Sequence, residues 1–266
     1  MSKRIFLLLF FASMLTSLAN AYDFTYNGLC YDILSNNSVR VTYEDQPMET
    51  ASYSNLRGDL VIPETVPHNG KTYSVKGIRA DAFWECRGLT SVTIPNSVEY
   101  IGESAFDTCS GLTGSLTIPN SVTGIGSSAF YQCSGLTSVT IGNSVTSIGY
   151  EAFSGCSGLT SVTIGNSVTS IDNKVFAYCS NVGEIICRAQ RPPKASDYSF
   201  EGMNYKKCVL YVPAGFAQVY WTATGWKNFD NIKELGAVEP IVGDITGDGK
   251  VDIEDVNAVI NIILSN

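Results

Sequence analysis

Apolar and polar positions alternate along the chain in a pattern that returns about every 23 residues. A phenylalanine marks each return: Phe83, Phe106, Phe130, Phe153 and Phe176. A cysteine follows three residues after each of them: Cys86, Cys109, Cys133, Cys156 and Cys179. The unit reads L-x-x-V-x-I-x-x-S-V-x-x-I-G-x-x-A-F-x-x-C, and CSGLTSVTIGNSVTSI occurs twice unchanged. Repetition at this period indicates a solenoid, in which each coil buries its apolar positions against the next coil.

Each unit carries a strand pattern. Val139 and Ile141 are two residues apart, which predicts a strand with these side chains inward and Ser138 and Thr140 outward. The outward pairs recur as Ser91 with Thr93, Ser115 with Thr117, Ser138 with Thr140 and Ser161 with Thr163. A second short strand is expected around Val145 to Ile148, after a turn marked by asparagine, and the AF-x-x-C segment is expected to form a short helical turn.

These motifs resemble the BspA-like leucine-rich repeats of secreted and surface proteins from anaerobic gut and oral bacteria. The resemblance covers roughly residues 59–187 and rests on F-x-x-C-S-G-L-T-S-V-T-I-P/G-N-S-V-T-S-I, present in four nearly complete copies. It implies a mainly β solenoid, a right-handed leucine-rich-repeat coil. It also implies an adhesin-like role, with binding to protein or glycoprotein partners on host or bacterial surfaces.

The segments beside the repeats are predicted to cap the solenoid, because an uncapped end would expose a core face to water. Residues 22–58 alternate apolar and polar positions and are expected to form an N-terminal β cap. Residues 188–236 are expected to form a C-terminal cap, with LYVP as a strand and a short helix from about Ala214 to Thr222. The residues expected to cover the last coil are Trp221, Trp226, Phe229 and Ile232.

Residues 1–21, MSKRIFLLLFFASMLTSLANA, have the features of a signal peptide. Lys3 and Arg4 precede an apolar run, and ANA has the small-x-small spacing of a cleavage site before Tyr22. No cysteine follows the cleavage site, so no lipobox is expected. No later run reaches the roughly 20 apolar residues that span a bilayer, so we expect no integral membrane segment. The sequence therefore predicts a secreted or cell-surface protein.

Charge narrows the class of partner. The chain has a formal net charge of -8 and no cluster of basic residues, which makes nucleic acid an unsuitable partner because phosphate contacts need clustered Lys and Arg. From Glu239 onward six acidic residues accompany a single basic residue, Lys250. This acidic segment is more typical of a cation site.

The run DITGDGKVDIED has the spacing of an EF-hand-type calcium loop, with Gly249 at position 6. Positions 1, 3, 5, 7, 9 and 12 are Asp244, Thr246, Asp248, Lys250, Asp252 and Asp255. Oxygen ligands at this spacing surround one Ca²⁺; position 7 contributes a backbone carbonyl, and Thr246 is expected to weaken binding. The alternative interpretation is an acidic, glycine-rich linker.

Together with the following VNAVINIIL, the loop resembles one dockerin type I repeat, with a small α-helical, EF-hand-like segment over residues 237–266. A dockerin normally carries two such repeats, whereas this chain has one. Its helix would present an apolar stripe: Val256, Val259, Ile260, Ile263 and Leu264. A cohesin-like module, a second copy of the chain or the repeat domain itself are the candidates to cover the stripe.

No pattern of catalytic residues is apparent. His68 is the one histidine, and GxSxG, HExxH and P-loop motifs are absent from the sequence, so we do not expect an enzyme. The Ser-x-Thr rows are either a ligand platform or a soluble β surface rich in strand-favouring threonine. Residues that interrupt the repeat, such as Glu99 and Tyr100, are better candidates for specific contacts. The candidate ligand face comprises Glu99, Tyr100, Ser138, Thr140, Ser161 and Thr163.

The eight cysteines allow both thiols and disulfides. Five recur at one position of the coil and are expected to be packed thiols. Cys187 and Cys208 are either bridged or reduced, and Cys30 is then left over.

The sequence thus favours a non-catalytic binding protein. The alternative is a dockerin-bearing assembly subunit of an extracellular polysaccharide-degrading complex. An enzyme acting on glycans is the weakest hypothesis.

Overall fold

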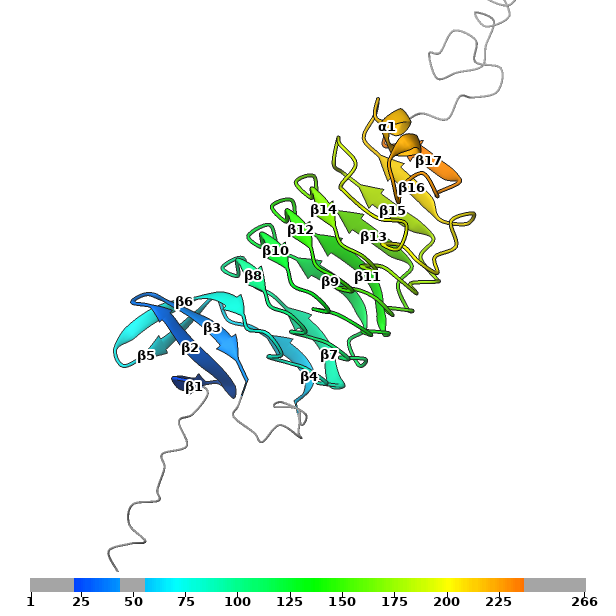
Figure 1. Cartoon of the computed structure of the whole chain (residues 1–266). Coiled ribbons are helices and arrows are strands. Elements are labelled where there is room, and N and C mark those ends of the chain that lie inside the picture. The colour runs from blue at the N-terminus through cyan, green and yellow to red at the C-terminus, as the bar shows by residue number, and fades with distance from the viewer. Residues whose placement is uncertain (1–21, 44–55, 237–266) are drawn as a thin grey trace, which may run out of the picture.

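The computed structural model describes residues 22–43 and 56–236, which form an elongated β-solenoid (Figure 1). The first strands are β1 (Phe24–Tyr26), β2 (Leu29–Ser35), β3 (Ser38–Thr42), β4 (Arg57–Val61), β5 (Thr65–His68) and β6 (Lys71–Ile78). One side of the coils carries β7 (Gly88–Thr93), β9 (Gly114–Ile118), β11 (Leu136–Ile141), β13 (Ser161–Ile164), β15 (Glu184–Cys187), β16 (Val209–Val212) and β17 (Asn231–Glu234). Another side carries the short strands β8 (Tyr100–Ile101), β10 (Gly124–Ile125), β12 (Ser147–Ile148) and β14 (Ser170–Ile171). The fold class predicted from the repeat, a mainly β solenoid with a period of about 23 residues, is confirmed.

Two sheets follow the length of the coils, and in both of them neighbouring coils pair in parallel. A six-stranded sheet has the order β17-β16-β15-β13-β11-β9, and a nine-stranded sheet runs β1-β2-β3-β6-β8-β10-β12-β14 with β5 paired to β6. β4 and β7 pair separately. The described part of the predicted N-terminal cap, β1 to β3, joins the nine-stranded sheet because β3 pairs with β6. The six-stranded sheet continues past residue 187, the predicted end of the repeats, through β16 and β17.

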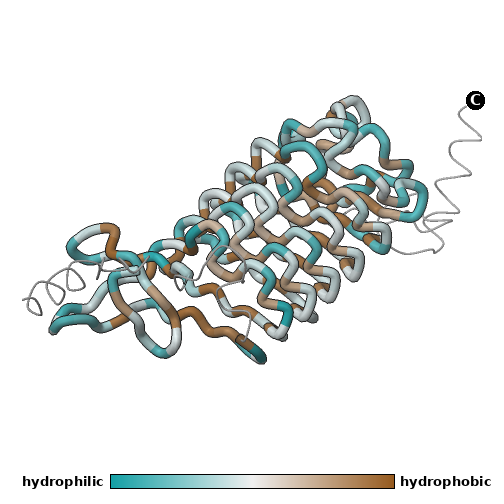
Figure 2. Tube along the Cα trace, turned by 60° about the horizontal axis from the view of Figure 1, so that its bottom comes forward, coloured by the Kyte–Doolittle hydropathy of each residue, from teal (hydrophilic) through white to brown (hydrophobic). Residues whose placement is uncertain are grey.

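The side-chain alternation within each coil is confirmed. Val139 and Ile141 are each 1% exposed, while Thr140 is exposed and Ser138 is half-buried. Val145 and Ile148 are also buried, as the second strand pattern predicted. Figure 2 shows these apolar positions returning from coil to coil along the tube. The core is therefore a column to which each coil contributes apolar side chains at the same repeat positions.

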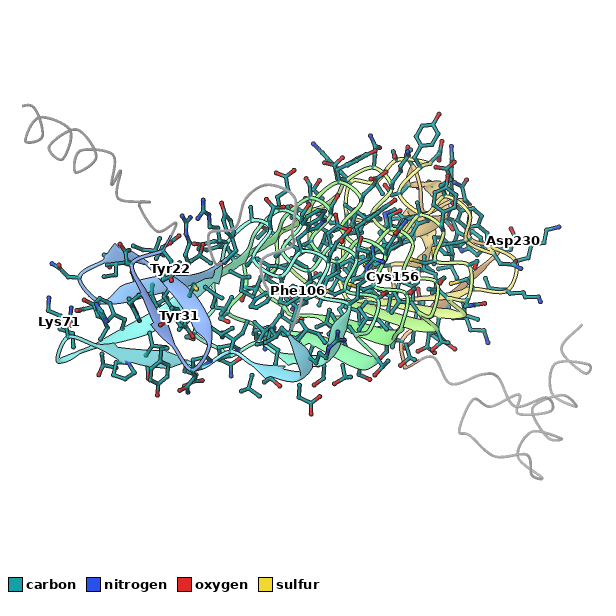
Figure 3. The ribbon with its side chains drawn as sticks, turned by 90° about the horizontal axis from the view of Figure 1, so that it is seen from below. Tyr22, Tyr31, Lys71, Phe106, Cys156 and Asp230 are labelled. Atoms are coloured by element: carbon teal, nitrogen blue, oxygen red, sulfur yellow. The ribbon has the colours of Figure 1, made fainter. Side chains whose placement is uncertain are left out.

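Phenylalanine rings stack through the centre of this column. Successive rings from Phe83 to Phe200 have centroids 5.0, 5.2, 5.2, 5.5 and 5.9 Å apart and interplanar angles of at most 13°. Phe106 and Cys156, labelled in Figure 3, belong to this interior. The column ends where Trp226 and Phe229 pack against Phe200 at 5.0 and 5.3 Å. Ring stacking thus repeats at nearly the spacing of hydrogen-bonded strands, about 4.8 Å.

The AF-x-x-C segments are not helical turns, contrary to the sequence-based expectation. Each contains one residue with left-handed backbone, such as Thr108 (φ 57°), and follows another, such as Ser104 (φ 50°), and a right-handed helix allows neither. The backbone N–H of Phe106 donates to Ala129 O of the next coil at 2.8 Å, instead of bonding four residues back. The segments therefore form a third ladder of hydrogen bonds between coils.

The repeated cysteines are buried thiols that link adjacent coils, as predicted. Cys133 Sγ donates to Phe106 O at 3.2 Å, and Cys156 Sγ donates to Phe130 O at 3.1 Å. All eight cysteines of the chain lie within the described residues, and none forms a disulfide.

The alternative of a bridge between Cys187 and Cys208 is wrong. Glu184 pairs with Val209, so Cys208 lies at the start of its strand and Cys187 at the far end of the neighbouring one. That offset of four residues amounts to roughly 13 Å along the strands, beyond the reach of a disulfide. Cys187 Sγ instead lies 3.2 Å from Tyr220 Oη.

The predicted strand and helix close the C-terminal coil, but Tyr220 and not Trp221 is the helix residue that covers the core. The first three residues of LYVP lie in β16, which ends at Val212, and α1 (Ala217–Thr222) is the expected short helix. Trp226 and Phe229 are fully buried, and Ile232 is half-buried. Trp221 was expected to cover the core but is 40% exposed, because the helix turns Tyr220 inward in its place. In the described ranges no helix is long and apolar enough to cross a membrane.

Two glycines bring the later coils into close contact. A Cβ on Gly142 would lie 2.5 Å from Pro119 O, and a Cβ on Gly165 would lie 2.3 Å from Gly142 O. Both distances are far shorter than normal van der Waals contact. These positions therefore need glycine if the coils are to stack at strand spacing.

The close contact at Gly142 leads to a prediction of stability. Gly142→Ala is expected to lower the free energy of unfolding by about 1–3 kcal/mol, because the methyl group pushes two coils apart. Gly124→Ala is the matched control, since the nearest atom to its Cβ is Ser147 Oγ at 3.8 Å. The control is expected to be neutral or slightly stabilising. Urea unfolding of both variants checks this, and equal losses would contradict the role of Gly142 in coil contact.

The buried thiols predict a loss of stability at alkaline pH. Burial raises the pKa of Cys156 well above its ordinary value and that of Cys179 to about 12. In the unfolded chain thiols ionise near pH 8.5, so above that pH only the unfolded state loses these protons. Each such thiol is expected to lower the free energy of unfolding by about 1.4 kcal/mol per pH unit until its folded pKa is reached.

The test is urea unfolding between pH 8 and pH 10, comparing the original chain with Cys156→Ala. The variant is expected to be less stable throughout, because it leaves a cavity, but to lose stability less steeply with pH. The same slope in both proteins would show that Cys156 ionises equally in both states.

Candidate binding groove

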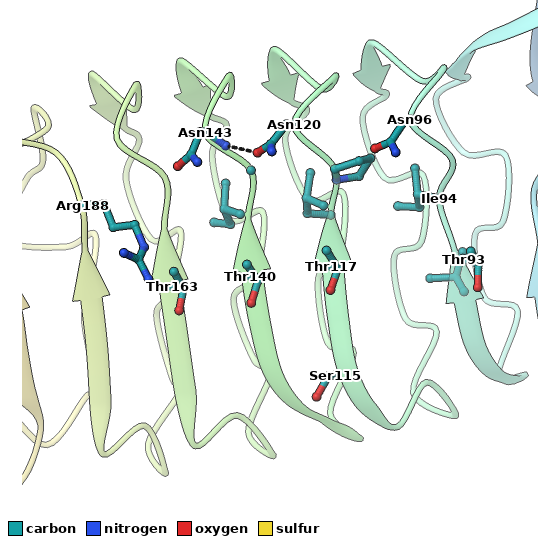
Figure 4. A pocket seen from close by; sticks show the side chains of 15 residues that line it. Thr93, Ile94, Asn96, Ser115, Thr117, Asn120, Thr140, Asn143, Thr163 and Arg188 are labelled. Carbon is teal, nitrogen blue, oxygen red and sulfur yellow. Dashed lines mark hydrogen bonds between the residues drawn. The ribbon is translucent and has the colours of Figure 1, made fainter. Parts of the chain in front are cut away.

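A groove of about 770 Å³ runs across the coils on the side of β7, β9, β11 and β13 (Figure 4). Its floor is a row of outward threonines, one from each strand: Thr93, Thr117, Thr140 and Thr163. Asn96, Asn120 and Asn143 line it at the turns that follow the strands. The groove is therefore built from the polar half of the repeat.

The parallel register keeps equivalent side chains opposite one another. Thr117 pairs with Thr140, and Thr140 pairs with Thr163. Ser138 Oγ donates to Ser115 Oγ at 2.7 Å, and the backbone N–H of Asn143 donates to Asn120 Oδ1 at 2.7 Å. These bonds hold a regular row of hydroxyl and amide groups at strand spacing, about 4.8 Å.

The structure brings together only part of the predicted ligand face. Thr140 and Thr163 line the groove, and Ser138 and Ser161 lie two residues earlier on the same strands. Tyr100 lies instead in β8, in the nine-stranded sheet, and Glu99 directly precedes that strand.

The side chains of Glu99 and Tyr100 are already engaged within the protein. Lys76 Nζ lies 2.8 Å from Glu99 Oε1. The ring of Tyr100 covers Gly77, where a Cβ would lie 2.1 Å from Tyr100 Cζ. These two residues therefore form a separate surface, joined to the first coil, and do not extend the threonine row.

Sequence reasoning missed Arg188, which lines the groove at the end near β15. Its side chain is exposed, and its guanidinium makes no hydrogen bond or ion pair with any residue that the structure describes. In the repeat this position is Gly142 or Gly165, so the arginine marks the point where the repeat changes to RAQRPPK. That departure from the pattern was the available signal. Arg188 also lines a second hollow with Arg191, which gives this end of the groove a positive charge.

The groove contains no arrangement typical of catalysis. Arg188 is the one charged residue among those lining it, and the others are hydroxyl, amide, proline, glycine and aliphatic residues. His68 lies at the other end of the molecule, in the β5–β6 hairpin, with its ring 4.1 Å from that of Phe24. Among the described residues that line the groove, none can act as a base for the threonine hydroxyls, and the groove offers hydrogen bonds and one cation.

The predicted calcium ligands Asp244, Thr246, Asp248, Lys250, Asp252 and Asp255 lie outside the described residues. In the described ranges, no group of three or more His, Cys, Asp or Glu side chains could hold a metal ion.

Comparison with known proteins identifies the repeat. Residues 76–206 match the BspA type leucine rich repeat region in six copies. No curated protein matches the chain.

Among solved structures, the chain is similar to the leucine-rich repeat protein TpLRR of T. pallidum, with 20% identity, a TM-score of 0.46 and coverage of 76% of this chain and 98% of that one. It is also similar to a leucine-rich repeat protein of Eubacterium ventriosum, with 21% identity, a TM-score of 0.45 and coverage of 67% and 51%. A leucine rich cell surface protein of Faecalibacterium prausnitzii shares 16% identity, with a TM-score of 0.31 and coverage of 80% and 95%.

The family match begins at residue 76, later than the predicted start at residue 59, and extends past the predicted end at residue 187. It includes Phe200, which continues the ring column. Residues 76–206 of this chain therefore match BspA-type leucine-rich repeats, in six copies.

Proposed function

We propose that this protein is a non-catalytic binding protein that recognises a protein or glycoprotein partner through the groove over β7 to β13. The observation that carries the proposal is the groove itself, a row of hydroxyl and amide groups with a single charged residue among its lining. Such a surface suits recognition, because it offers many weak hydrogen bonds in a fixed geometry and lacks groups that activate a nucleophile.

Arg188 is the expected anchor of the interaction. Arginine is enriched among residues that dominate binding energy, and this one has no partner of its own in the described protein. The rigid core beneath the groove lowers the entropy lost on binding, because the row of side chains is ordered before the partner arrives. The predicted signal peptide and the BspA-type repeats support a secreted or cell-surface location, and thus an adhesin-like role.

A bulky charge in the groove is expected to abolish capture of the partner. Thr140→Arg places a long side chain in the middle of the row, whereas Ser147→Arg places the same side chain on the nine-stranded sheet as a matched control. Immobilised protein is incubated with extracts of host matrix and of bacterial surfaces, and the captured proteins are compared. We expect the control to keep the partners of the original chain and Thr140→Arg to lose them. Equal capture by both variants would move the binding surface away from the groove.

We also propose that residues 237–266 form a calcium-binding, dockerin-like repeat that attaches the solenoid to a partner module. The spacing of Asp244, Asp248 and Asp252, with Gly249 at position 6, supports one Ca²⁺ site. A cohesin-like module or a second copy of the chain is expected to cover the apolar stripe that begins at Val256. On this proposal the protein is an assembly subunit of an extracellular polysaccharide-degrading complex.

Removal of two ligand carboxylates is expected to abolish calcium binding. Asp244→Ala combined with Asp248→Ala removes positions 1 and 5 of the loop, while Glu239→Ala removes a nearby charge outside it. Calorimetric titration with Ca²⁺ is expected to show one site in the original chain and in the control, and none in the double variant. Unchanged binding in the double variant would exclude this loop as the site.

A further inference from the structure

We propose that the partner enters the groove as an extended polypeptide segment, which adds to the free edge of β9 as a strand in the gap between β7 and β9. This inference rests on the proposed function and specifies its mode of recognition. The gap lies within the groove, because Val92, Thr93 and Ile94 of the first coil and Ser115, Thr117 and Ile118 of the next all line it.

The two strands that border the gap are both edges. β9 is the last strand of the six-stranded sheet, and β7 is the outer strand of a separate pair with β4. Within the described residues, a backbone hydrogen bond from Thr113 N to Thr90 O joins the coils before the gap opens. Figure 4 shows β7 standing farther from β9 than β9 stands from β11. The ladder that connects every later coil is thus interrupted here.

The sequence explains the interruption. The spacing between Phe106 and Phe130 is one residue longer than elsewhere, and Gly114, with φ 70°, lies in the extra length. At the other end of β9, Pro119 and its counterpart in the preceding coil, Pro95, occupy one position of the repeat. In later coils this position is Gly142 or Gly165. Those glycines permit contacts that no Cβ allows. A proline in their place keeps its two coils apart.

Backbone groups of β9 point into the gap. Thr93 O accepts from Ile62 N, so an outward residue of this repeat directs its carbonyl toward the preceding coil. Ile164 O accepts from Arg188 N, so an inward residue directs its carbonyl toward the following coil. By the same alternation Ser115 and Thr117 direct their N–H and C=O groups toward β7. Among the described residues these groups have no backbone partner, and they form a row at strand spacing.

The chemistry of the gap favours a polypeptide over a glycan. An edge of alternating amide donors and acceptors is matched by another peptide backbone, which is the basis of strand addition. The apolar column is also less covered here, since Ile94 is 8% exposed whereas Ile118 and Ile141 are each 1% exposed. Val92 is only partly buried as well. A strand with alternate aliphatic side chains would complete the column while its backbone completes the sheet.

The probe for this site is a blocked, fluorescein-labelled peptide with the sequence LTSVTIG, the segment of this chain at residues 136–142. It carries the same alternation as the strands on both sides of the gap. Binding to the full chain is measured by fluorescence anisotropy, and the site is located by hydrogen–deuterium exchange. A peptide with proline for valine, LTSPTIG, serves as the control ligand because it lacks one backbone donor.

Without peptide, the amides of Ser115 and Thr117 are expected to exchange quickly, in contrast to the paired amides of β11. With peptide they are expected to slow by about tenfold or more. Thr117→Pro removes the N–H that faces the gap, and an edge strand tolerates this proline. The variant is expected to bind the peptide about tenfold more weakly. Thr117→Val keeps that N–H and is expected to bind like the original chain.

Three results would overturn the proposal. In the first, Thr117→Pro and Thr117→Val bind the peptide equally. In the second, Ser115 and Thr117 are protected in the free chain at every concentration, which means that a segment of the chain itself fills the gap. In the third, their protection rises with protein concentration alone, which assigns the edge to a second copy. If the chain does not bind the peptide while Thr140→Arg still abolishes capture of the partner, strand addition is excluded as the mode of binding and the groove is still the binding surface.

Discussion

The distance between neighbouring coils is the constraint on which the rest of this structure depends. Hydrogen-bonded strands require about 4.8 Å between coils, and every other contact must repeat at nearly that interval. The phenylalanine rings stack at 5.0 to 5.9 Å, and the thiol of Cys156 reaches a carbonyl of the preceding coil at 3.1 Å. Gly142 has no side chain because none fits at this distance. The near-identity of the repeats follows from this constraint, since a larger residue at one coil displaces its neighbours on both sides.

The same constraint separates the surface into regular and irregular parts. Where the repeat is intact, outward residues such as Thr140 form a row whose spacing is fixed by the core beneath it. Where the repeat changes, the coils separate or a new side chain enters the groove. Gly114 and Pro119 mark the first kind of change, and Arg188 marks the second. The two changes lie toward opposite ends of one groove, so a ligand lying along it meets a regular middle and two distinctive ends.

Much of this architecture was predictable because it depends on side-chain periodicity. The alternation around Val139 predicted which residues are buried, and the Phe and Cys positions predicted the column. The AF-x-x-C segment was misassigned because its spacing also suits a helical turn, and nothing local shows that Ser104 adopts left-handed backbone. Trp221 was misplaced by one position because a six-residue helix offers too little pattern to fix its buried face. The grouping of Glu99 with the threonine row did not hold, because one coil contributes to two sheets and sequence spacing does not separate them.

Repetition also explains why recognition must depend on departures from the repeat. Identical coils offer a partner the same hydrogen bonds at several registers. A ligand bound only by the threonine row therefore shifts by one coil at little energetic cost. A single fixed register requires contacts that occur once. The unpaired edge of β9 and the guanidinium of Arg188 each occur once along the groove, and they differ in chemistry, one being a row of backbone amides and the other a charge. A partner that engages both is held in one direction and one register, which the repeated surface alone cannot impose.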